Sequence, residues 1–110
     1  EIHHIHKLDA PSGTALTLIN EIMERVGRTS GWVLTPNLPQ PGEIPVTAIR
    51  EGEVPGTHIV KWESPVDEIA IEHRAHSRMG FANGAILAAK WLSEKKGVFS
   101  MKDVLGLNDL

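Results

Sequence analysis

Cysteine is absent from the 110 residues of this sequence, and long apolar runs are absent as well. Without cysteine the chain can form neither a disulfide framework nor a thiolate metal site. The longest apolar stretches fall far short of the roughly 20 residues that a membrane-spanning helix needs. No signal-peptide pattern is visible at the start of the chain. We therefore expect a cytoplasmic protein with no membrane segment.

The sequence also lacks an excess of basic charge. Lysine and arginine together number 11, aspartate and glutamate number 14, and the formal net charge is -3. Domains that bind nucleic acid usually concentrate positive charge, so we expect no nucleic-acid partner. With 41% hydrophobic and 23% charged residues, the composition is that of an ordinary globular protein. The length predicts one domain, large enough to bury a core.

The first residue is Glu1 and not methionine, and a dense polar stretch follows it directly. The termini of natural domains are usually bland and frayed. We therefore interpret the sequence as a fragment cut from the interior of a longer protein.

Apolar residues at helical spacing predict two main helices. The first covers residues 14–26, and either Asp9 or Ser12 can cap its start. The second covers residues 81–95 and carries small residues that would let it lie close to a sheet. A third, short helix is expected to begin after Ser100, a typical N-cap residue.

Alternating apolar and polar residues predict strands in four segments. These segments cover residues 1–8, 44–50, 57–63 and 67–76, and a short strand is expected at 32–34 inside a long surface loop. Short links join the last three of the four strands, so we expect them to pair antiparallel. Residues 51–56 would then form a hairpin-like turn.

The order of these elements predicts an α+β fold with a mixed, largely antiparallel sheet. We expect the two main helices to pack on one face of this sheet. The opposite face would then leave apolar residues without cover, among them Ile49, Ile59 and Trp62. Exposed apolar surface of this kind is typical of an interface, so the second face is expected to serve oligomerisation.

The start of the sequence holds a candidate site for an anionic small molecule. In a strand over residues 1–8, His3 and Lys7 would point to one face and His4 to the other. The Ser-Gly-Thr run at residues 12–14 opens the first helix, and the free amides at a helix N-terminus attract anions. Lysine adds positive charge, and imidazoles can move protons near neutral pH. The combination favours anion binding with acid–base chemistry.

Each of these features also has a simpler interpretation. The Ser-Gly-Thr run can be no more than a helix cap, and a single lysine or histidine on a strand is usually solvated surface. A metal site is a further alternative, because His4 and His6 have the His-x-His spacing of some zinc and copper sites, with Asp9 nearby. The third ligand would have to be His58, His73 or His76, and no spacing supports any of them. We expect no metal.

Residues 1–15 read E-I-H-H-I-H-K-L-D-A-P-S-G-T-A. They closely resemble the signature E-x-H-H-x-x-K-x-D-A-P-S-G-T-A of the dihydrodipicolinate reductases. The match is long and free of gaps, and it includes residues of catalytic type as well as residues typical of turns.

Three further segments resemble the same family. Residues 50–58 resemble its segment R-x-G-x-x-G-x-H, carried here by Arg50, Gly52, Gly56 and His58. Residues 72–82 resemble a second block, roughly H-x-A-x-S-R-x-x-F-A, and residues 101–107 resemble the family's C-terminus. The resemblance spans the whole chain and is weakest in residues 28–43.

The resemblance implies an oxidoreductase of diaminopimelate and lysine biosynthesis. Enzymes of this family reduce 4-hydroxy-tetrahydrodipicolinate (dihydrodipicolinate), a small cyclic dicarboxylate, to tetrahydrodipicolinate with NADPH or NADH. By resemblance, His3 is a proton donor or acceptor, and Lys7 is a second residue that donates a proton or polarises the substrate. Substrate binding is expected from His4, Ser12, Gly13 and Thr14, and contact with the cofactor from Arg78 and Phe81.

The family's nucleotide-binding half has no counterpart in this sequence. That half carries a Rossmann fold with a glycine-rich phosphate loop before a helix, whereas the glycines at 52 and 56 lie between two predicted strands. We therefore expect residues 1–110 to be the C-terminal substrate-binding and assembly domain, inactive as a reductase on its own. The resemblance further implies a homotetramer. The competing interpretation is a non-catalytic oligomerisation or anion-binding module without a redox half.

Overall fold

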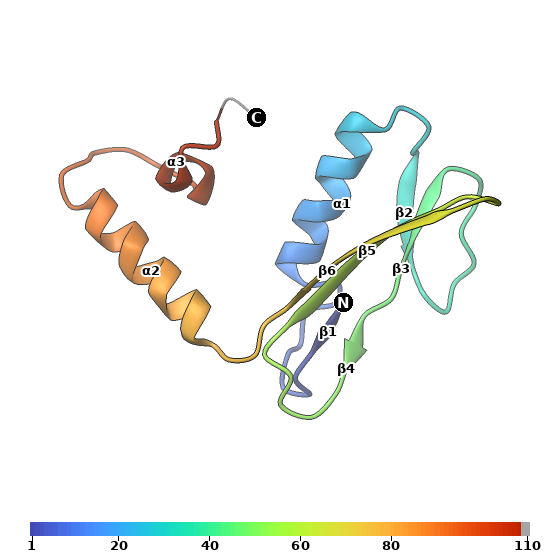
Figure 1. Cartoon of the computed structure of the whole chain (residues 1–110), viewed down its shortest axis with the longest axis horizontal. Coiled ribbons are helices and arrows are strands. Elements are labelled where there is room, and N and C mark those ends of the chain that lie inside the picture. Colours follow the sequence, from blue (N-terminus) through green and yellow to red (C-terminus); the bar gives the residue numbers. More distant parts are fainter. Residues whose placement is uncertain (109–110) are drawn as a thin grey trace. The chain divides into compact units, whose positions relative to one another are not determined.

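The computed structural model describes residues 1–108 of the chain. These fall into two compact units, Glu1–Ala75 and a second that begins at His76. The first unit contains all the described strands and one long helix, and the described part of the second contains only helices and loops (Figure 1). No helix of the described residues has the length and apolar character needed to cross a membrane.

Three helices and six strands make up the described residues. The helices are α1 (Gly13–Arg25), α2 (Met79–Leu92) and α3 (Met101–Leu105). The strands are β1 (Ile2–His3), β2 (Gly31–Leu34), β3 (Glu43–Val46), β4 (Ile49–Arg50), β5 (Thr57–Glu63) and β6 (Glu68–Arg74). Both main helices are confirmed, as are the strands predicted at 57–63 and 67–76, with shifts of a few residues at their ends.

The first unit is built on a four-stranded sheet with the order β4-β1-β5-β6. β1 pairs parallel with β4 and antiparallel with β5, and β5 pairs antiparallel with β6. The sheet is therefore mixed and largely antiparallel, and the predicted α+β class is confirmed. β2, expected as a short strand, forms a separate parallel pair with β3 that the sequence did not predict.

The predicted strand over residues 1–8 is wrong beyond His3, where β1 ends. Residues 5–6 lie in a turn. The N–H of Ile5 donates to the carbonyl of Gly52 at 3.1 Å, and Gly52 has a φ of 47°, in the left-handed region that glycine adopts without strain. Ile5 is exposed. The alternating pattern of apolar residues therefore extends past the end of the strand into a turn, where it does not mark a buried sheet face.

The predicted strand over residues 44–50 is wrong as a single element, because the chain passes from one sheet to another within it. Its first part is β3, which pairs with β2, and its last part is β4, which pairs with β1. The predicted hairpin at residues 51–56 does not form, since β1 lies between β4 and β5. Ile2 pairs with Ile49, far along the chain, and local alternation carries no information on such a partner.

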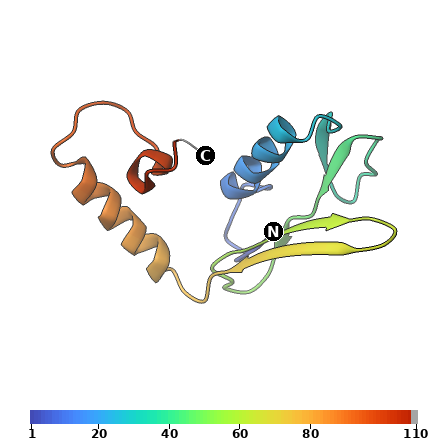
Figure 2. The same ribbon diagram turned by 45° about the horizontal axis from the view of Figure 1, so that its top comes forward.

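α1 begins where Ser12 provides the N-cap. The Ser12 hydroxyl accepts a hydrogen bond from the N–H of Ala15 at 3.2 Å, which confirms one of the two predicted caps. Ala15 and Ile19, one helical turn apart, are the buried residues of the helix. α1 lies over one face of the sheet (Figures 1 and 2), as the predicted layer arrangement requires.

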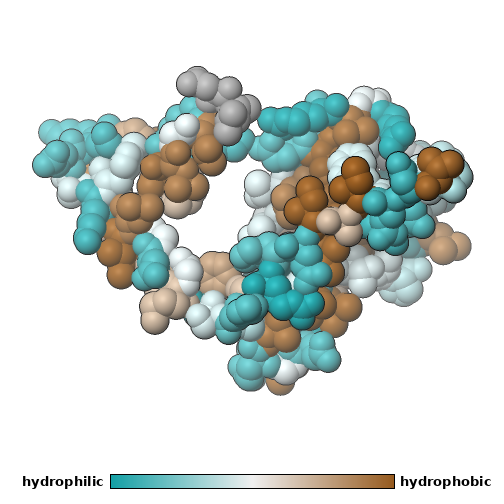
Figure 3. All heavy atoms as spheres, viewed as in Figure 1, coloured by the Kyte–Doolittle hydropathy of each residue, from teal (hydrophilic) through white to brown (hydrophobic). Residues whose placement is uncertain are grey.

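The second unit contains α2, α3 and the loop between them. Trp91 packs edge-on against Phe99 with ring centroids 5.0 Å apart, and Nζ of Lys95 lies 4.5 Å from the centre of the Trp91 ring. Ser100 starts α3 as predicted, because its N–H and hydroxyl donate to the Asp103 carboxylate. Hydrophobic side chains gather along α2 and α3 (Figure 3). The expected packing of α2 on the sheet stays a prediction.

Replacing Ile19 with alanine should lower the free energy of unfolding by about 2 kcal/mol, the lower end of the range for such changes. Ile19 is 5% exposed, but it also borders a cavity, so fewer contacts are lost than in a filled core. Denaturant unfolding measures the change. Asn20→Ala, at the exposed neighbouring position, is the control and should change the stability by less than about 0.5 kcal/mol. Equal effects at the two positions would contradict the packing of α1.

Candidate functional site

Glu1 places a carboxylate in the interior of the first unit, where its side chain is only 2% exposed. Arg50 contacts both oxygens, with Nη1 at 3.1 Å from Oε2 and Nη2 at 3.0 Å from Oε1. The backbone N–H of Ser12 donates to Oε1 at 3.3 Å, and Nδ1 of His3 contacts Oε2. Such two-pronged pairing of arginine with a carboxylate is strong and directional. The carboxylate thus joins β1 to β4 and to the start of α1.

The parallel pairing of β1 and β4 brings Arg50 to this carboxylate. His3 and Arg50 are partners in the register of the two strands. The Arg50 guanidinium also donates to the backbone carbonyls of Lys7 and Asp9. One side chain therefore holds both the strand and the loop that leads to α1.

Two histidines lie side by side next to this carboxylate. β1 pairs with β5 at Ile2 and Thr57. The pairing brings His58 beside His3, with ring centroids 5.0 Å apart and an angle of 71° between the ring planes. His3 is buried, and Nε2 of His58 lies 3.0 Å from the hydroxyl of Ser12. The second imidazole therefore contacts the residue that caps α1.

Burial and charge set the protonation of these groups. Burial raises the pKa of the Glu1 carboxyl, but hydrogen bonds from Arg50 and His3 and the charge of the guanidinium outweigh it and lower the pKa below its ordinary value. Burial lowers the pKa of His58, and repulsion from His3 lowers it further. Near neutral pH the site therefore holds an ionised Glu1 and a neutral His58.

The start of α1 presents two of the predicted substrate-binding residues to solvent. Gly13 and Thr14 are exposed, and Gly13 is the first residue of the helix. The amides of a first helical turn lack helical partners and favour anions. Ser12 is different, because it is buried and its hydroxyl already contacts Ala15 and His58. Ser12 supports the site from within, whereas Gly13 and Thr14 are open to a ligand.

Lys7 lies beyond the end of β1, so the expectation that it shares a strand face with His3 is not met. Its Nζ lies 2.8 Å from Oδ1 of Asp9. This hydrogen bond is the main reason that the pKa of Asp9 lies below its ordinary value. Lys7 therefore belongs to the loop before α1, with its charge partly balanced by a neighbouring carboxylate.

His4 has a ring nitrogen in the interior without a partner. Its Nδ1 is buried and, within the described part of the chain, makes no hydrogen bond. Buried polar atoms in folded proteins are nearly always hydrogen-bonded. This nitrogen lacks a partner and has almost no accessible surface, so the role that the family resemblance implies for His4 stays a prediction.

The potential metal ligands that come together in residues 1–108 are not the His4–His6 pair of the sequence pattern. They are Glu1, His3 and His58, whose ligand atoms lie within 4.8 Å of one another. The Arg50 guanidinium occupies both oxygens of the carboxylate, and its fixed positive charge opposes a cation at the same place. The geometry favours an acid–base cluster over a metal centre.

Arg78 and Phe81, the predicted cofactor contacts, lie in the second unit. Arg78 is the N-cap residue of α2, and its side chain makes no capping hydrogen bond. Phe81 is exposed in the first turn of the same helix. Their contact with a cofactor stays a prediction.

Glu1, Arg50 and His58 were not among the predicted site residues, although the structure brings all three to His3. Each of them stands in a segment that carries the family resemblance. Arg50 and His58 are far from His3 in the sequence, and no spacing rule connects them. The matched segments include all three residues, but the positions of Arg50 and His58 beside β1 follow only from the sheet pairing, whereas Glu1 lies two residues before His3 in the chain.

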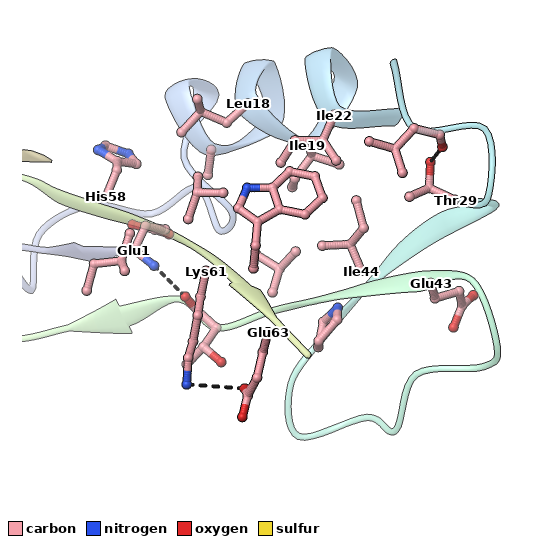
Figure 4. A pocket seen from close by; sticks show the side chains of 18 of the residues that line it. Glu1, Leu18, Ile19, Ile22, Thr29, Glu43, Ile44, His58, Lys61 and Glu63 are labelled. Atoms are coloured by element: carbon pink, nitrogen blue, oxygen red, sulfur yellow. Dashed lines mark hydrogen bonds and ion pairs between the residues drawn. The ribbon is translucent and has the colours of Figure 1, made fainter. Parts of the chain in front are cut away.

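A cavity of about 870 Å³ lies between α1, β3 and β5. Leu18 and Ile19 point toward it from α1, and Ile44 borders it from β3 (Figure 4). Most of its wall is apolar, with Glu1 and His58 at one end. Its lining also includes two cationic residues, Arg28 and Lys61.

Comparison with known proteins identifies the family. Residues 1–105 match the family described as dihydrodipicolinate reductase, C-terminus. A 4-hydroxy-tetrahydrodipicolinate reductase of Christiangramia forsetii is 53% identical over 105 residues, which cover 96% of this chain and 43% of that protein. A protein of the same name from Laribacter hongkongensis is 42% identical over 113 residues, which cover 97% of this chain and 42% of that protein. The chain thus spans less than half the length of these relatives.

The fold is shared with a solved structure, the dipicolinate-bound dihydrodipicolinate reductase from Paenisporosarcina sp. TG-14. The two agree with a TM-score of 0.63 at 24% sequence identity, over 93% of this chain and 42% of that one. The resemblance drawn from the sequence motifs is confirmed, and the chain belongs to the dihydrodipicolinate reductase C-terminal family.

Proposed function

We propose that this chain is the substrate-binding and assembly domain of a 4-hydroxy-tetrahydrodipicolinate reductase. Such an enzyme reduces 4-hydroxy-tetrahydrodipicolinate to tetrahydrodipicolinate in diaminopimelate and lysine biosynthesis, a cytoplasmic pathway. The observation that carries the proposal is the 53% identity to a reductase of this name over 96% of the chain. The buried His3 and the half-buried His58, beside an exposed helix N-terminus, support it, because this arrangement suits proton transfer to a bound anion.

The rest of the reductase is proposed to contribute a dinucleotide-binding domain. This chain covers 43% of its relative from C. forsetii. Its described residues contain no G-x-G-x-x-G turn between a strand and a helix that could hold a pyrophosphate. When bound, NADPH or NADH supplies the hydride, and Arg78 and Phe81 are the residues of this chain proposed to contact it.

His3 is proposed to exchange a proton with the substrate. The reduction adds a hydride and a proton overall, and the proton must come from the protein or from water. An imidazole changes its protonation near neutral pH, and the burial of His3 limits competition from water. Lys7 is proposed as a second donor, or as the charge that polarises the substrate.

The two carboxylates of the substrate are proposed to bind at the start of α1 and at Lys7. Gly13 and Thr14 offer backbone amides and one hydroxyl at an exposed helix N-terminus. Lys7 adds a positive charge from the loop that Arg50 holds. His4, which precedes this loop, is proposed as a further contact with the substrate.

We propose that the domain assembles into a homotetramer through its sheet. His58 and Trp62 share the face of β5 that looks toward α1, so the expectation that Trp62 lies on the uncovered face is wrong. Ile59 and Lys61 point to the other face. Ile59 is exposed there. α1 does not cover this face of the sheet. The exposed side chain of Ile59 is therefore suited to a contact with a second copy of the chain.

In the full-length reductase, His3→Gln should lower kcat by about 10²–10⁴-fold and change KM far less, because a proton donor acts in the transition state. Steady-state NAD(P)H oxidation in the presence of substrate measures both constants. His6→Gln, at a nearby exposed histidine, is the matched control and should leave kcat unchanged. This chain alone should show no substrate-dependent NAD(P)H oxidation. An unchanged kcat in His3→Gln would assign His3 to structure.

Pyridine-2,6-dicarboxylate should bind the full-length reductase and inhibit it. Thr14→Val should weaken this binding by roughly 1–3 kcal/mol, since a charged acceptor loses its hydroxyl donor. Lys7→Met should weaken it as well and should also lower kcat. Calorimetry gives the dissociation constant, and Thr17→Val, the same change at another exposed position of α1, is the control. If Thr14→Val alters the melting temperature and leaves the dissociation constant alone, residues 12–14 serve only to start the helix.

Light scattering of the full-length reductase at micromolar concentration should give the mass of a tetramer. Ile59→Arg should shift the mass toward smaller species, because an arginine in the sheet interface would bury a charge without a partner. Asn20→Arg, on an exposed position of α1, should leave the mass unchanged. A wild-type monomer would exclude the tetramer, and a tetramer that tolerates Ile59→Arg would place its interface elsewhere.

A further inference from the structure

Glu1 and His3 form a carboxylate–imidazole pair inside the first unit. Oε2 of Glu1 contacts Nδ1 of His3, and the exposed fractions of the two side chains are 2% and 11%. An ionised carboxylate can only accept a hydrogen bond, so Nδ1 carries the proton that joins them. The hydrogen bonds found among the described residues leave Nε2 of His3 uncommitted. Nε2 is therefore the nitrogen that can give a proton to a substrate or take one.

We propose that Glu1 is a positioning residue for His3 and that Arg50 keeps Glu1 in this role. The Glu1 carboxylate fixes the orientation of the imidazole and keeps its Nδ1 protonated, which directs Nε2 to the substrate. This role rests on the proposed function, because His3 is the proposed proton donor. A carboxylate that orients a histidine through one nitrogen and leaves the other for chemistry is a recurrent arrangement in enzymes.

Arg50 prevents the carboxylate from taking the proton of the pair. Its guanidinium donates to both oxygens, and the N–H of Ser12 donates to one of them. Burial raises the pKa of the Glu1 carboxyl, and the contacts with Arg50 and His3 more than reverse this effect. A carboxylate stabilised in this way stays ionised, so the Nδ1 proton remains on the imidazole, and Nε2 is left to exchange a proton with the substrate.

His58 packs against the His3 ring. The two rings meet edge to face with centroids 5.0 Å apart, and the Ser12 hydroxyl lies 3.0 Å from Nε2 of His58. Burial lowers the pKa of His58, with a further contribution from His3, so His58 is neutral near pH 7 and does not repel a protonated His3. The His3 ring thus contacts the Glu1 carboxylate through Nδ1 and the uncharged His58 ring in a T-shaped arrangement.

Glu1→Gln in the full-length reductase tests the role of the carboxylate. The amide keeps the size of the side chain but can donate to Nδ1, which favours the other tautomer of the imidazole. We expect kcat to fall by about 10–100-fold, the effect typical of losing the partner that orients a functional histidine. The dissociation constant of pyridine-2,6-dicarboxylate should change by less than about 3-fold, because binding does not need the tautomer.

Glu53→Gln is the matched control for this substitution. Glu53 pairs with Nε2 of His6 at 3.0 Å, and both side chains are exposed. The same chemical change is thereby made to a glutamate–histidine pair at the surface. It should leave kcat and the dissociation constant of the inhibitor unchanged.

A double-mutant cycle separates positioning of His3 from support of the fold. If Glu1 acts through His3, Glu1→Gln should lower kcat by less than about 3-fold in a His3→Gln background, because the group that it positions is already gone. A carboxylate that only holds Arg50 and the loop before α1 would lower kcat by the same factor in both backgrounds. The cycle therefore gives different results for the two roles.

Glu1→Asp provides a second variant in case Glu1→Gln does not fold. Aspartate keeps the charge that faces Arg50 but withdraws the carboxylate from His3 by one methylene, so the same fall in kcat and the same non-additivity are expected. An unchanged kcat in a folded Glu1 variant, or equal losses in both backgrounds, overturns the positioning role. If His3→Gln itself leaves kcat unchanged, the proposed proton-donor role of His3 is wrong. If His3→Gln lowers kcat but the Glu1 variants do not, only the positioning role of Glu1 is wrong.

Discussion

The ion pair between Glu1 and the partly exposed Arg50 is the interaction on which the first unit depends. It joins β1 to β4, and through the carbonyls of Lys7 and Asp9 it also holds the loop before α1. Removing one partner of a buried ion pair typically costs about 3–5 kcal/mol, because the other charge is left without compensation. The intact pair adds little net stability, but it selects one arrangement of the strands. Here it selects the parallel register that sets Arg50 beside His3.

This constraint matters because β1 is short. It consists of Ile2 and His3 alone, yet it stands between β4 and β5 in the sheet. So few ladder hydrogen bonds cannot define the position of a strand, and the side chains around it must do so. The guanidinium of Arg50 on β4, which binds Glu1, and the ring of His58 on β5 fulfil this task from opposite neighbours of β1. The proposed proton donor therefore stands on a restrained segment, which favours a fixed catalytic geometry.

The space beneath α1 is divided between polar and apolar chemistry. At the N-terminal end of the helix, Ser12 contacts Glu1 and His58, and the exposed amides of the first turn favour an anion. Toward the C-terminal end, Ile19 and Ile22 border the apolar cavity. The dipole of α1 and the charge of Arg50 both favour negative charge at the N-terminal end of the helix. The proposed dicarboxylate site and the polar cluster thus lie where the field of the helix supports them.

The sequence by itself determined the parts of this protein that depend on near neighbours. Helical spacing and the caps at Ser12 and Ser100 predicted α1 and α3, and the alternation over 57–63 and 67–76 predicted β5 and β6. The motif at the start of the chain also identified the family, and it included Gly13 and Thr14, which the structure exposes at the start of α1.

Only the tertiary structure decided the pairing of the strands and the composition of the polar cluster. β1 ends at His3, and residues 44–50 divide between two sheets, because each segment follows partners that lie far away in the sequence. Alternation reports which side chains are apolar, but it does not name the neighbouring strand. The contact of Glu1 with Arg50 and the contact of His3 with His58 exist because β1 lies between β4 and β5.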